Sequence, residues 1–200
     1  MKSCFSAFLA ASLLTLTGCA KDYALKPGDI VFQVSKTTQG VAVQQATGSP
    51  YTHCGVIFDD HGTLKVLEAV GPVKVTPVKE FVAASDPGTF CAKRLKNPIS
   101  PEAFAKGSAW AASQLGKSYD TGFQWSDDRI YCSELVWKAY AAAGVQLCKP
   151  RPFKSYDLKQ PAVKQIVAKR YGSIDKLPLD ELAVAPGDLA NSPLLADVAK

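Results

Sequence analysis

The segment 127–137, with the sequence DDRIYCSELVW, places a cysteine where a turn gives way to an amphipathic helix. Apolar and aromatic residues recur at helical spacing after Cys132, and Gly144 is a C-terminal stop signal, so a helix is predicted over 132–143. A thiol in the first helical turn lies near unpaired backbone N–H groups and the positive end of the helix dipole, which favour the thiolate. Free cysteines are also common packing residues. The position of Cys132 therefore leaves chemistry and packing as alternatives.

The first residues form a separate segment. A short basic start precedes an apolar run over 5–16, which is too short to span a bilayer easily, and the sequence Leu-Thr-Gly-Cys follows over 16–19. This pattern resembles a bacterial lipobox. The resemblance implies cleavage before Cys19 and a lipid anchor on its sulfur, while Ala20 implies the outer membrane, with the protein facing the periplasm. We expect a signal peptide over 1–18 and a lipidated tether over 19–26.

The rest of the chain predicts one globular domain over 27–190 and a poorly structured tail over 191–200. The chain has 200 residues, of which 47% are hydrophobic, enough for one well-buried core. Basic residues exceed acidic ones by five, with a formal net charge of +5, but they are scattered and are not interleaved with aromatic residues. This pattern is typical of a solvated surface and does not predict nucleic-acid binding.

Six cysteines have different expected fates. Cys4 leaves with the signal peptide and Cys19 carries lipid, which leaves Cys54, Cys91, Cys132 and Cys148 in a compartment where disulfides can form. None of the spacings is CxxC, and the chain has only two histidines. We therefore expect neither a metal site nor a cofactor.

The predicted elements describe an α+β domain. Strand-forming residues and turn signals predict strands over 30–34, 52–58, 63–70, 73–77 and 90–95. Helical spacing and capping residues predict helices over 39–46, 101–115, 132–143 and 161–170.

The two strands over 52–58 and 63–70 form a predicted hairpin with 59–62 as its loop. In that register Gly55 faces Val66 and His53 faces Glu68, and directly opposed residues have Cβ atoms about 4.5–5.5 Å apart on one face. The same face carries Ile57, so it points to the core, with Gly55 leaving open space beside the imidazole. A register slip by one residue would send Glu68 to the other face.

A cysteine nucleophile needs a base, and the base needs an orienting partner. His53 and Glu68 fit these roles, with Glu68 holding the imidazole tautomer. Taken alone, His53 is better explained by a cross-strand salt bridge or a satisfied core histidine. A partnered His53 together with Cys132 at a helix start favours the catalytic interpretation. Cys54, next along the strand, points to the opposite face as a packing residue.

The order of these motifs resembles a known family. A strand with SPYTHCG, a second strand with LEAVGPVK and a late helix opened by DDRIYCSELVW are similar to the circularly permuted papain-like amidases of the YaeF/YiiX type, within the NlpC superfamily. The resemblance implies a permuted papain-like fold with an antiparallel sheet packed against helices. It also implies Cys132 as nucleophile, His53 as base and Glu68 as orienting group. Cys54 departs from the pattern, in which an aliphatic residue is more usual, and adds a thiol beside the triad.

Further site residues are predicted from their proximity. The backbone N–H of Cys132 is the first oxyanion donor, with Tyr51 and Gln33 as candidates for a second. Tyr131 and Trp125 flank the nucleophile and are candidates for the substrate cleft, with core packing as the alternative.

The triad itself does not select a reaction. The leading hypothesis is an amidase or peptidase that acts through an acyl-enzyme on a cell-envelope peptide. The alternatives are a lipid deacylase or acyltransferase with the same triad, and a non-catalytic lipoprotein that binds envelope peptides. The expected partners are a peptide or acyl substrate and the membrane surface.

Overall fold

A computed structural model describes residues 23–199 of the chain. The predicted signal peptide and the lipidation site at Cys19 lie outside the described residues. Within the described part, no helix is long and apolar enough to cross a membrane.

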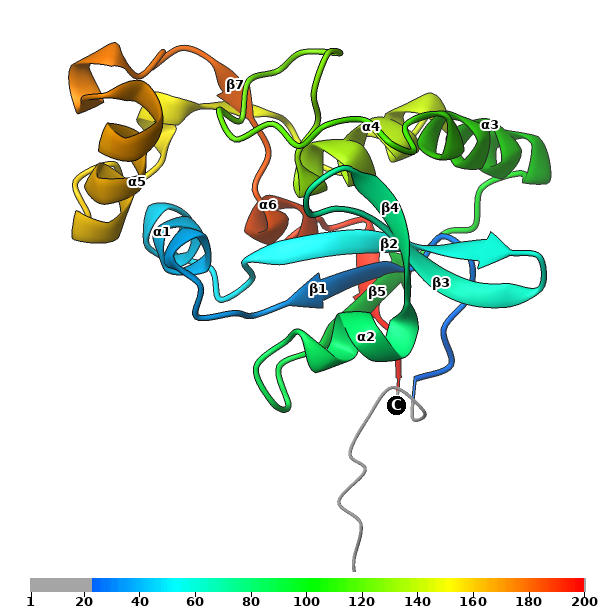
Figure 1. Ribbon diagram of the computed structural model, residues 1–200. Helices are drawn as coiled ribbons and strands as arrows, with labels where there is room; N and C mark the ends of the chain where they lie inside the picture. Colours follow the sequence, from blue (N-terminus) through cyan, green and yellow to red (C-terminus); the bar gives the residue numbers. More distant parts are fainter. Residues whose placement is uncertain (1–22, 200) are drawn as a thin grey trace, which may run out of the picture.

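The centre of the fold is a six-stranded antiparallel sheet with the strand order β4-β3-β2-β1-β5-β8 (Figure 1). The strands are β1 (Ile30–Gln33), β2 (His53–Asp60), β3 (Thr63–Ala69), β4 (Val73–Pro77), β5 (Cys91–Leu95) and β8 (Leu195–Asp197). The five strands expected from the sequence are confirmed to within two residues at each end.

Helices surround the sheet. They are α1 (Thr38–Thr47), α2 (Val78–Ala83), α3 (Pro101–Ser113), α4 (Cys132–Ala142), α5 (Pro161–Tyr171) and α6 (Pro186–Ala190). Short 3₁₀ turns, η2 (Phe153–Ser155) and η3 (Ile174–Lys176), and the strand pair β6 (Arg151–Pro152) and β7 (Leu182–Ala183) complete the chain. The four predicted helices are confirmed, whereas α2 and α6 are too short for a helical period to reveal.

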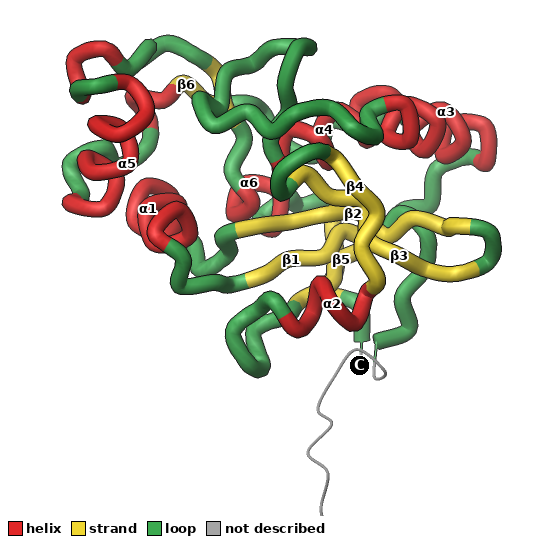
Figure 2. Tube along the Cα trace, viewed as in Figure 1, coloured by secondary structure: helices red, strands yellow, loops and turns green. Residues whose placement is uncertain are grey.

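The sheet separates two apolar layers. Helices α3 and α4 cover one face and α2 covers the other, while α1 and α5 pair beside the end of the sheet where β2 begins (Figure 2). Phe32, Cys54 and Val56 are buried in the same cluster as Leu135 and Val136 of α4. Alternate residues of the same strands, with Val31, Ile57 and Val66 among them, pack with Phe81 of α2. The period-two pattern of the strands thus fixes which side chains meet α4.

The predicted boundaries of the domain are wrong at both ends. Leu195–Asp197 forms β8, which pairs with β5 through Lys93↔Asp197 and Leu95↔Leu195, so the described part of the predicted tail is not poorly structured. Tyr23 and Leu25 pack against the α2-side cluster, so the end of the predicted tether belongs to the domain. Three residues are too few for a strand pattern to show, and their pairing depends on β5.

The hairpin register differs from the predicted one by two residues. The strands continue to Asp60 and Thr63, and only His61 and Gly62, both with positive φ, form the turn. The pairing is Ile57↔Val66 instead of Gly55 with Val66. A shift of two keeps every side chain on its predicted face, because the side-chain period of a strand is two.

Gly55 does not leave open space, contrary to the prediction. A Cβ atom there would lie 2.5 Å from Val66 Cγ1 and 2.9 Å from the Leu67 carbonyl oxygen. Glycine is therefore required because β3 approaches β2 closely at this point.

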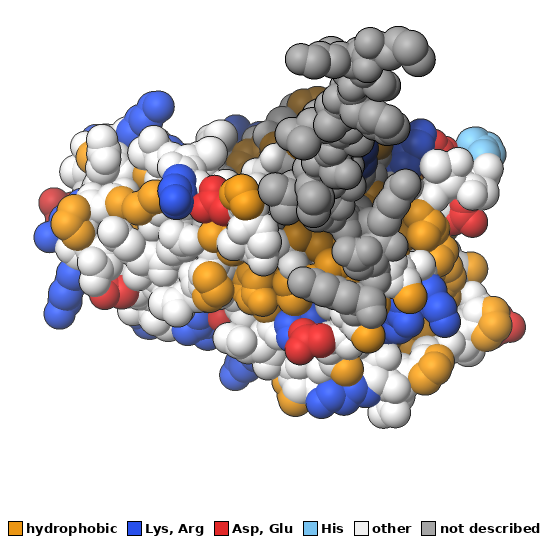
Figure 3. All heavy atoms as spheres, turned by 90° about the horizontal axis from the view of Figure 1, so that it is seen from below, with side chains coloured by type: hydrophobic (Ala, Val, Ile, Leu, Met, Phe, Trp, Pro, Cys, Tyr) orange, Lys and Arg blue, Asp and Glu red, His pale blue; other side chains and the backbone are white. Residues whose placement is uncertain are grey.

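The face seen from the α2 side carries dispersed basic side chains (Figure 3). Lysines and arginines lie apart from one another there, with acidic and apolar groups between them. This view matches the scattered charge of the sequence.

The contact between α3 and α4 depends on Gly107. A Cβ atom at this position would lie 2.8 Å from the Ala139 carbonyl oxygen and 3.0 Å from Ala143 Cβ. We predict that Gly107→Ala lowers the free energy of unfolding by about 1–3 kcal/mol, because the helices must separate. Chemical denaturation measures this change, and Lys106→Ala, on the exposed side of the same helix, is the control. Equal stability of the two variants would contradict the prediction.

Candidate active site

Cys132 is the first residue of α4 and is 4% exposed. The chain before it is held by a bridge between Tyr119 and Ile130, in which the Ile130 N–H donates to the Ser118 carbonyl at 3.1 Å. The Tyr131 N–H donates to the Glu134 carboxylate at 3.3 Å across the first helical turn. These bonds fix the start of α4, so the position of the thiol is set by the backbone on both sides.

His53 stands at the start of β2 with Glu68 beside it. The His53 Nε2 atom lies 2.6 Å from Glu68 Oε2, and Thr76 Oγ1 donates to Glu68 Oε1 at 2.5 Å. The side chains of His53 and Glu68 are 14% and 6% exposed. Cys132 interacts with His53 closely enough to raise the pKa of the imidazole. Since Nε2 is engaged by Glu68, the Nδ1 atom is left for the thiol. The structure thus brings together the three predicted residues.

The charges of His53 and Cys132 stabilise each other. Burial alone lowers the pKa of His53, but the Cys132 thiolate and then Glu68 outweigh it and raise this pKa to about 9. The hydrogen bond from Cys54 and the positive charge of His53 outweigh burial and hold the pKa of Cys132 well below its ordinary value. The two shifts therefore favour a thiolate on Cys132 paired with an imidazolium on His53.

Cys54 contributes to this balance, which the sequence interpretation did not predict. It is fully buried on the α4 side of β2, and its side chain hydrogen-bonds Cys132. Burial raises the pKa of the Cys54 thiol well above its ordinary value, so Cys54 is the S–H donor and Cys132 the accepting thiolate. Cys54, Cys91, Cys132 and Cys148 are all free thiols.

Glu68 remains ionised in its buried position. Burial raises its pKa, but the hydrogen bond and the charge of His53, with the Thr76 hydroxyl, lower it below the ordinary value. A buried carboxylate with partners on both oxygens fixes the imidazole ring in one orientation.

The two predicted oxyanion donors have other contacts. Gln33 pairs with His53 across β1 and β2, and its Nε2 donates to the Phe81 carbonyl oxygen of α2. The Tyr51 ring packs against Phe32 at 5.1 Å, and its hydroxyl hydrogen-bonds Cys91 of β5. Neither contact involves the thiol, so the backbone at the start of α4 is the better-placed oxyanion site.

Tyr131 and Trp125, the two residues predicted for the substrate cleft, lie in different parts of the structure. Tyr131 is buried in the wall beside Cys132, and its hydroxyl accepts a hydrogen bond from the Val184 N–H at 3.1 Å. Trp125 packs edge-on against Trp137 at 5.1 Å, outside the cavity at Cys132. Both residues precede the nucleophile in the sequence, but Tyr131 is the N-cap of α4, whereas Trp125 lies in the loop before it and packs on Trp137.

A cavity opens beside Cys132 between α1 and α5. Its volume is about 130 Å³ for the centre of a water-sized sphere. The side chains of its wall are mostly aliphatic or aromatic, including Ala42, Val43, Val163, Ile166, Val167 and Leu177. Sequence interpretation missed this cavity because it lies between α1 and α5, which are far apart in the sequence.

Tyr119 and its neighbours form the polar end of this cavity. The Tyr119 hydroxyl accepts a hydrogen bond from Gln39 Nε2 at 3.0 Å, and Arg170 Nη2 donates to Gln39 Oε1 at 2.5 Å. Burial raises the pKa of Tyr119, and the negative charge of Cys132 raises it further. The Arg170 guanidinium lies over the Phe123 ring, 4.8 Å from its centre. Tyr119 thus connects the nucleophile to the end of α5.

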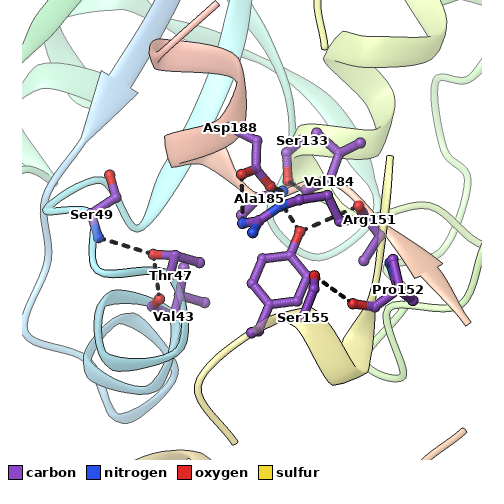
Figure 4. A network of polar contacts seen from close by, with 12 residues as sticks. Val43, Thr47, Ser49, Ser133, Arg151, Pro152, Ser155, Val184, Ala185 and Asp188 are labelled. Atoms are coloured by element: carbon purple, nitrogen blue, oxygen red, sulfur yellow. Dashed lines mark hydrogen bonds and ion pairs between the residues drawn. The ribbon is translucent and has the colours of Figure 1, made fainter. Parts of the chain in front are cut away.

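A polar network holds the opposite wall. Ser133 Oγ donates to the Val184 carbonyl at 2.7 Å, and Asp188 accepts bonds from Arg151 and from the Ala185 N–H (Figure 4). The segment 184–188 is therefore attached to α4 one residue beyond the nucleophile.

The family described as "Permuted papain-like amidase enzyme, YaeF/YiiX, C92 family" matches residues 24–199. The chain belongs to this family. Its fold is accordingly the permuted papain-like one, in which the histidine strand precedes the cysteine helix.

Two relatives cover nearly the whole chain. The uncharacterized protein YiiX of Escherichia coli (strain K12) is 39% identical over 191 residues, which are 94% of each chain. The crystal structure of metalloprotein yiiX from Escherichia coli O157:H7 matches with a TM-score of 0.81 and 41% identity, covering 88% of this chain and 97% of that one.

The description of that relative as a metalloprotein raises the question of a metal here. Among residues 23–199, no three His, Cys, Asp or Glu side chains form a group that could hold a metal ion. His53 and Glu68 bind each other, and the second carboxylate oxygen of Glu68 accepts from Thr76. With these atoms engaged by protein partners, His53 and Glu68 do not fit a metal ion.

The ion pair predicts how Cys132 reacts with alkylating reagents. In the intact protein we expect labelling to persist at pH values well below the ordinary cysteine pKa of about 8.5. His53→Ala removes the positive charge and should move the pH midpoint of labelling upward. Iodoacetamide labelling across a pH series, with Cys132 located by peptide mass, measures this shift. His61→Ala, whose ring is 99% exposed in the hairpin turn, is the matched control. Uniformly slow labelling in all variants would favour the non-catalytic binding lipoprotein.

Proposed function

We propose that the chain is a cysteine amidase in which Cys132 is the nucleophile, His53 the general base and acid, and Glu68 the orienting group. The observation that carries this proposal is that His53 bonds Glu68 at 2.6 Å and also contacts the thiol at the start of α4. Membership in a family of papain-like amidases supports the reaction class.

The reaction follows from the positions of the charges. The Cys132 sulfur attacks the carbonyl carbon, and the negative charge on the oxygen develops near the backbone N–H groups that begin α4. His53 gives its proton to the leaving nitrogen as the C–N bond breaks. Water then attacks the thioester while His53 takes a proton, and the acid leaves as Cys132 returns to the thiolate.

The substrate is proposed to be an amide of the cell envelope, such as a murein-derived peptide. The lipobox resemblance at Cys19 supports this location, since a lipid anchor would place the domain at the periplasmic face of the outer membrane. One observation favours the second candidate, a lipid deacylase or acyltransferase: the cavity that meets Cys132 has a mostly apolar wall.

Trapping the acyl-enzyme tests the proposal. Rapid acid quenching during turnover, followed by intact-protein mass measurement, should show an adduct on Cys132 whose mass identifies the acyl group. Cys132→Ala should carry no adduct, because alanine offers no nucleophile, and Cys148→Ser, which changes a half-buried thiol outside the site, should behave as the parent. An adduct that persists in Cys132→Ala would overturn the assignment.

The pH profile supplies a further prediction. Since the His53 pKa is raised to about 9, kcat/KM should stay level through neutral pH and fall above pH 9 as the imidazolium loses its proton. The acidic fall, where Cys132 takes up a proton, should lie below the ordinary cysteine pKa of about 8.5, because the pKa of Cys132 is lowered. Because His53 and Cys132 interact, the acidic and alkaline limbs of the profile both reflect the titration of the two residues as a pair. A profile that keeps rising to pH 10 would contradict an ion-paired site.

Removal of Glu68 tests its orienting role. Glu68→Ala should reduce kcat/KM by on the order of 10²- to 10⁴-fold, because the ring loses its fixed orientation. Glu68→Gln keeps a partner for Thr76 but loses the charge, so the alkaline limb should move to lower pH. Steady-state kinetics over a pH series measures both effects, with Glu80→Ala on the exposed side of α2 as control. An unchanged alkaline limb in Glu68→Gln would exclude an electrostatic role.

A further inference from the structure

Two free thiols, Cys54 and Cys132, lie where the sheet and α4 pack against each other. Cys54 is the second residue of β2, and Cys132 is the first residue of α4. Both side chains are buried in the same apolar cluster between the sheet and this helix. Thr52, two residues before Cys54, lines one cavity together with Cys132. The start of β2 therefore meets the start of α4, and a side-chain hydrogen bond joins the two thiols there.

The two thiols differ in their access from solvent. Cys132 lines the cavity that opens between α1 and α5, whereas Cys54 is fully buried and lies outside the wall of that cavity. A small oxidant that enters the cavity therefore reaches Cys132 first. The lowered pKa of Cys132 adds to this difference, because oxidation of cysteine proceeds from the thiolate.

Cys91 and Cys148 are not placed to bond either of these two thiols. Phe32 of β1 pairs with Cys54 on one side and with Cys91 on the other, so two strand spacings separate the two cysteines. That separation is about 9–10 Å, beyond the Cα distance of about 7 Å that a disulfide tolerates. The thiol of Cys148 has the charged pair of Arg151 and Asp188 as its neighbours. Within residues 23–199, Cys54 is therefore the thiol partner of Cys132.

We infer that Cys54 and Cys132 form a redox-active pair, in which a peroxide oxidises Cys132 and Cys54 then closes a disulfide that reversibly blocks the nucleophile. The Cys132 thiolate attacks the peroxide, the O–O bond breaks, and the sulfur is oxidised to a sulfenic acid while the oxidant is reduced to hydroxide. The Cys54 sulfur attacks the sulfenic sulfur, and its proton leaves with the S–OH oxygen as water. The block on catalysis rests on the proposed function, whereas the disulfide does not.

Oxidation of Cys132 changes the surroundings of Cys54. In the reduced site, burial raises the pKa of Cys54, and the hydrogen bond and negative charge of Cys132 raise it further. A sulfenic acid lacks the thiolate charge, so Cys54 ionises more readily once Cys132 is oxidised. The same change removes a charge that raises the pKa of His53, so the imidazole becomes a better proton acceptor beside the pair. Oxidation at Cys132 thus activates Cys54 as the resolving thiol.

Peptide mass mapping after peroxide treatment tests the inference. The full chain is treated with hydrogen peroxide, its free thiols are alkylated with iodoacetamide, and the digest is analysed without reduction. We expect a linked peptide that contains Cys54 and Cys132 and is lighter than its two parts by two hydrogen atoms. Iodoacetamide labelling of Cys132 should be lost, and dithiothreitol should restore it. Absence of the linked peptide in the parent chain would overturn the inference, and this measurement does not depend on the folding of any variant.

Replacement of the resolving thiol supplies the matched comparison. Cys54→Val keeps an apolar side chain in the cluster and should form no link, so that Cys132 proceeds to the sulfinic acid, which dithiothreitol does not reduce. The loss of Cys132 labelling should therefore be permanent in this variant. Cys91→Val, which removes a thiol from a strand of the same sheet, is the control and should recover as the parent does. Recovery of Cys54→Val equal to that of the parent would contradict the resolving role.

The inference and the proposed function fail separately. A link between Cys54 and Cys132 in a chain that turns over no amide or ester would support the redox pair and overturn the proposed catalysis. Cys132-dependent turnover, with peroxide oxidation that stops at the sulfinic acid in the parent, would overturn the redox pair and leave the amidase assignment standing.

Discussion

The packing of α4 across β2 is the contact on which the site depends. Leu135 and Val136 are fully buried against the sheet face that carries Cys54 and Val56. This burial fixes the axis of α4, and the axis directs its first residue toward the start of β2. Each of these aliphatic side chains contributes about 1.5–3 kcal/mol by leaving water. The apolar core therefore stabilises the position of a charged pair that would be costly to bury without a partner.

The charged pair is supported from both faces of the sheet. Cys54 reaches Cys132 from the α4 side, while His53 and Glu68 lie on the side that Phe81 covers. Because β2 begins at this point, side chains from both faces of the sheet can approach Cys132. His53 and Cys54 are consecutive residues with opposite side-chain directions, and both therefore interact with the same thiolate.

The hairpin shows how far a pattern predicts geometry. Alternation assigned His53 and Glu68 to one face, and that assignment is confirmed although the register is displaced by two residues. The turn was the source of the error, since positive φ at His61 and Gly62 permits a two-residue loop where four polar residues suggested a longer one. The same displacement brings β3 against Gly55, which a pattern cannot reveal because it contains no interstrand distance.

The sequence by itself determined the α+β class, five of the six main strands, the helix that begins at Cys132 and the family resemblance, because these depend on local period, capping and motif order. The contact between His53 and Glu68 was also predicted, since two strands adjacent in the chain form it. Only the tertiary structure decided that Cys54 donates to Cys132, that β8 completes the sheet, and that α1 and α5 enclose an apolar chamber beside the thiol. Each of these joins segments distant in sequence, and their meeting depends on the packing of the whole core.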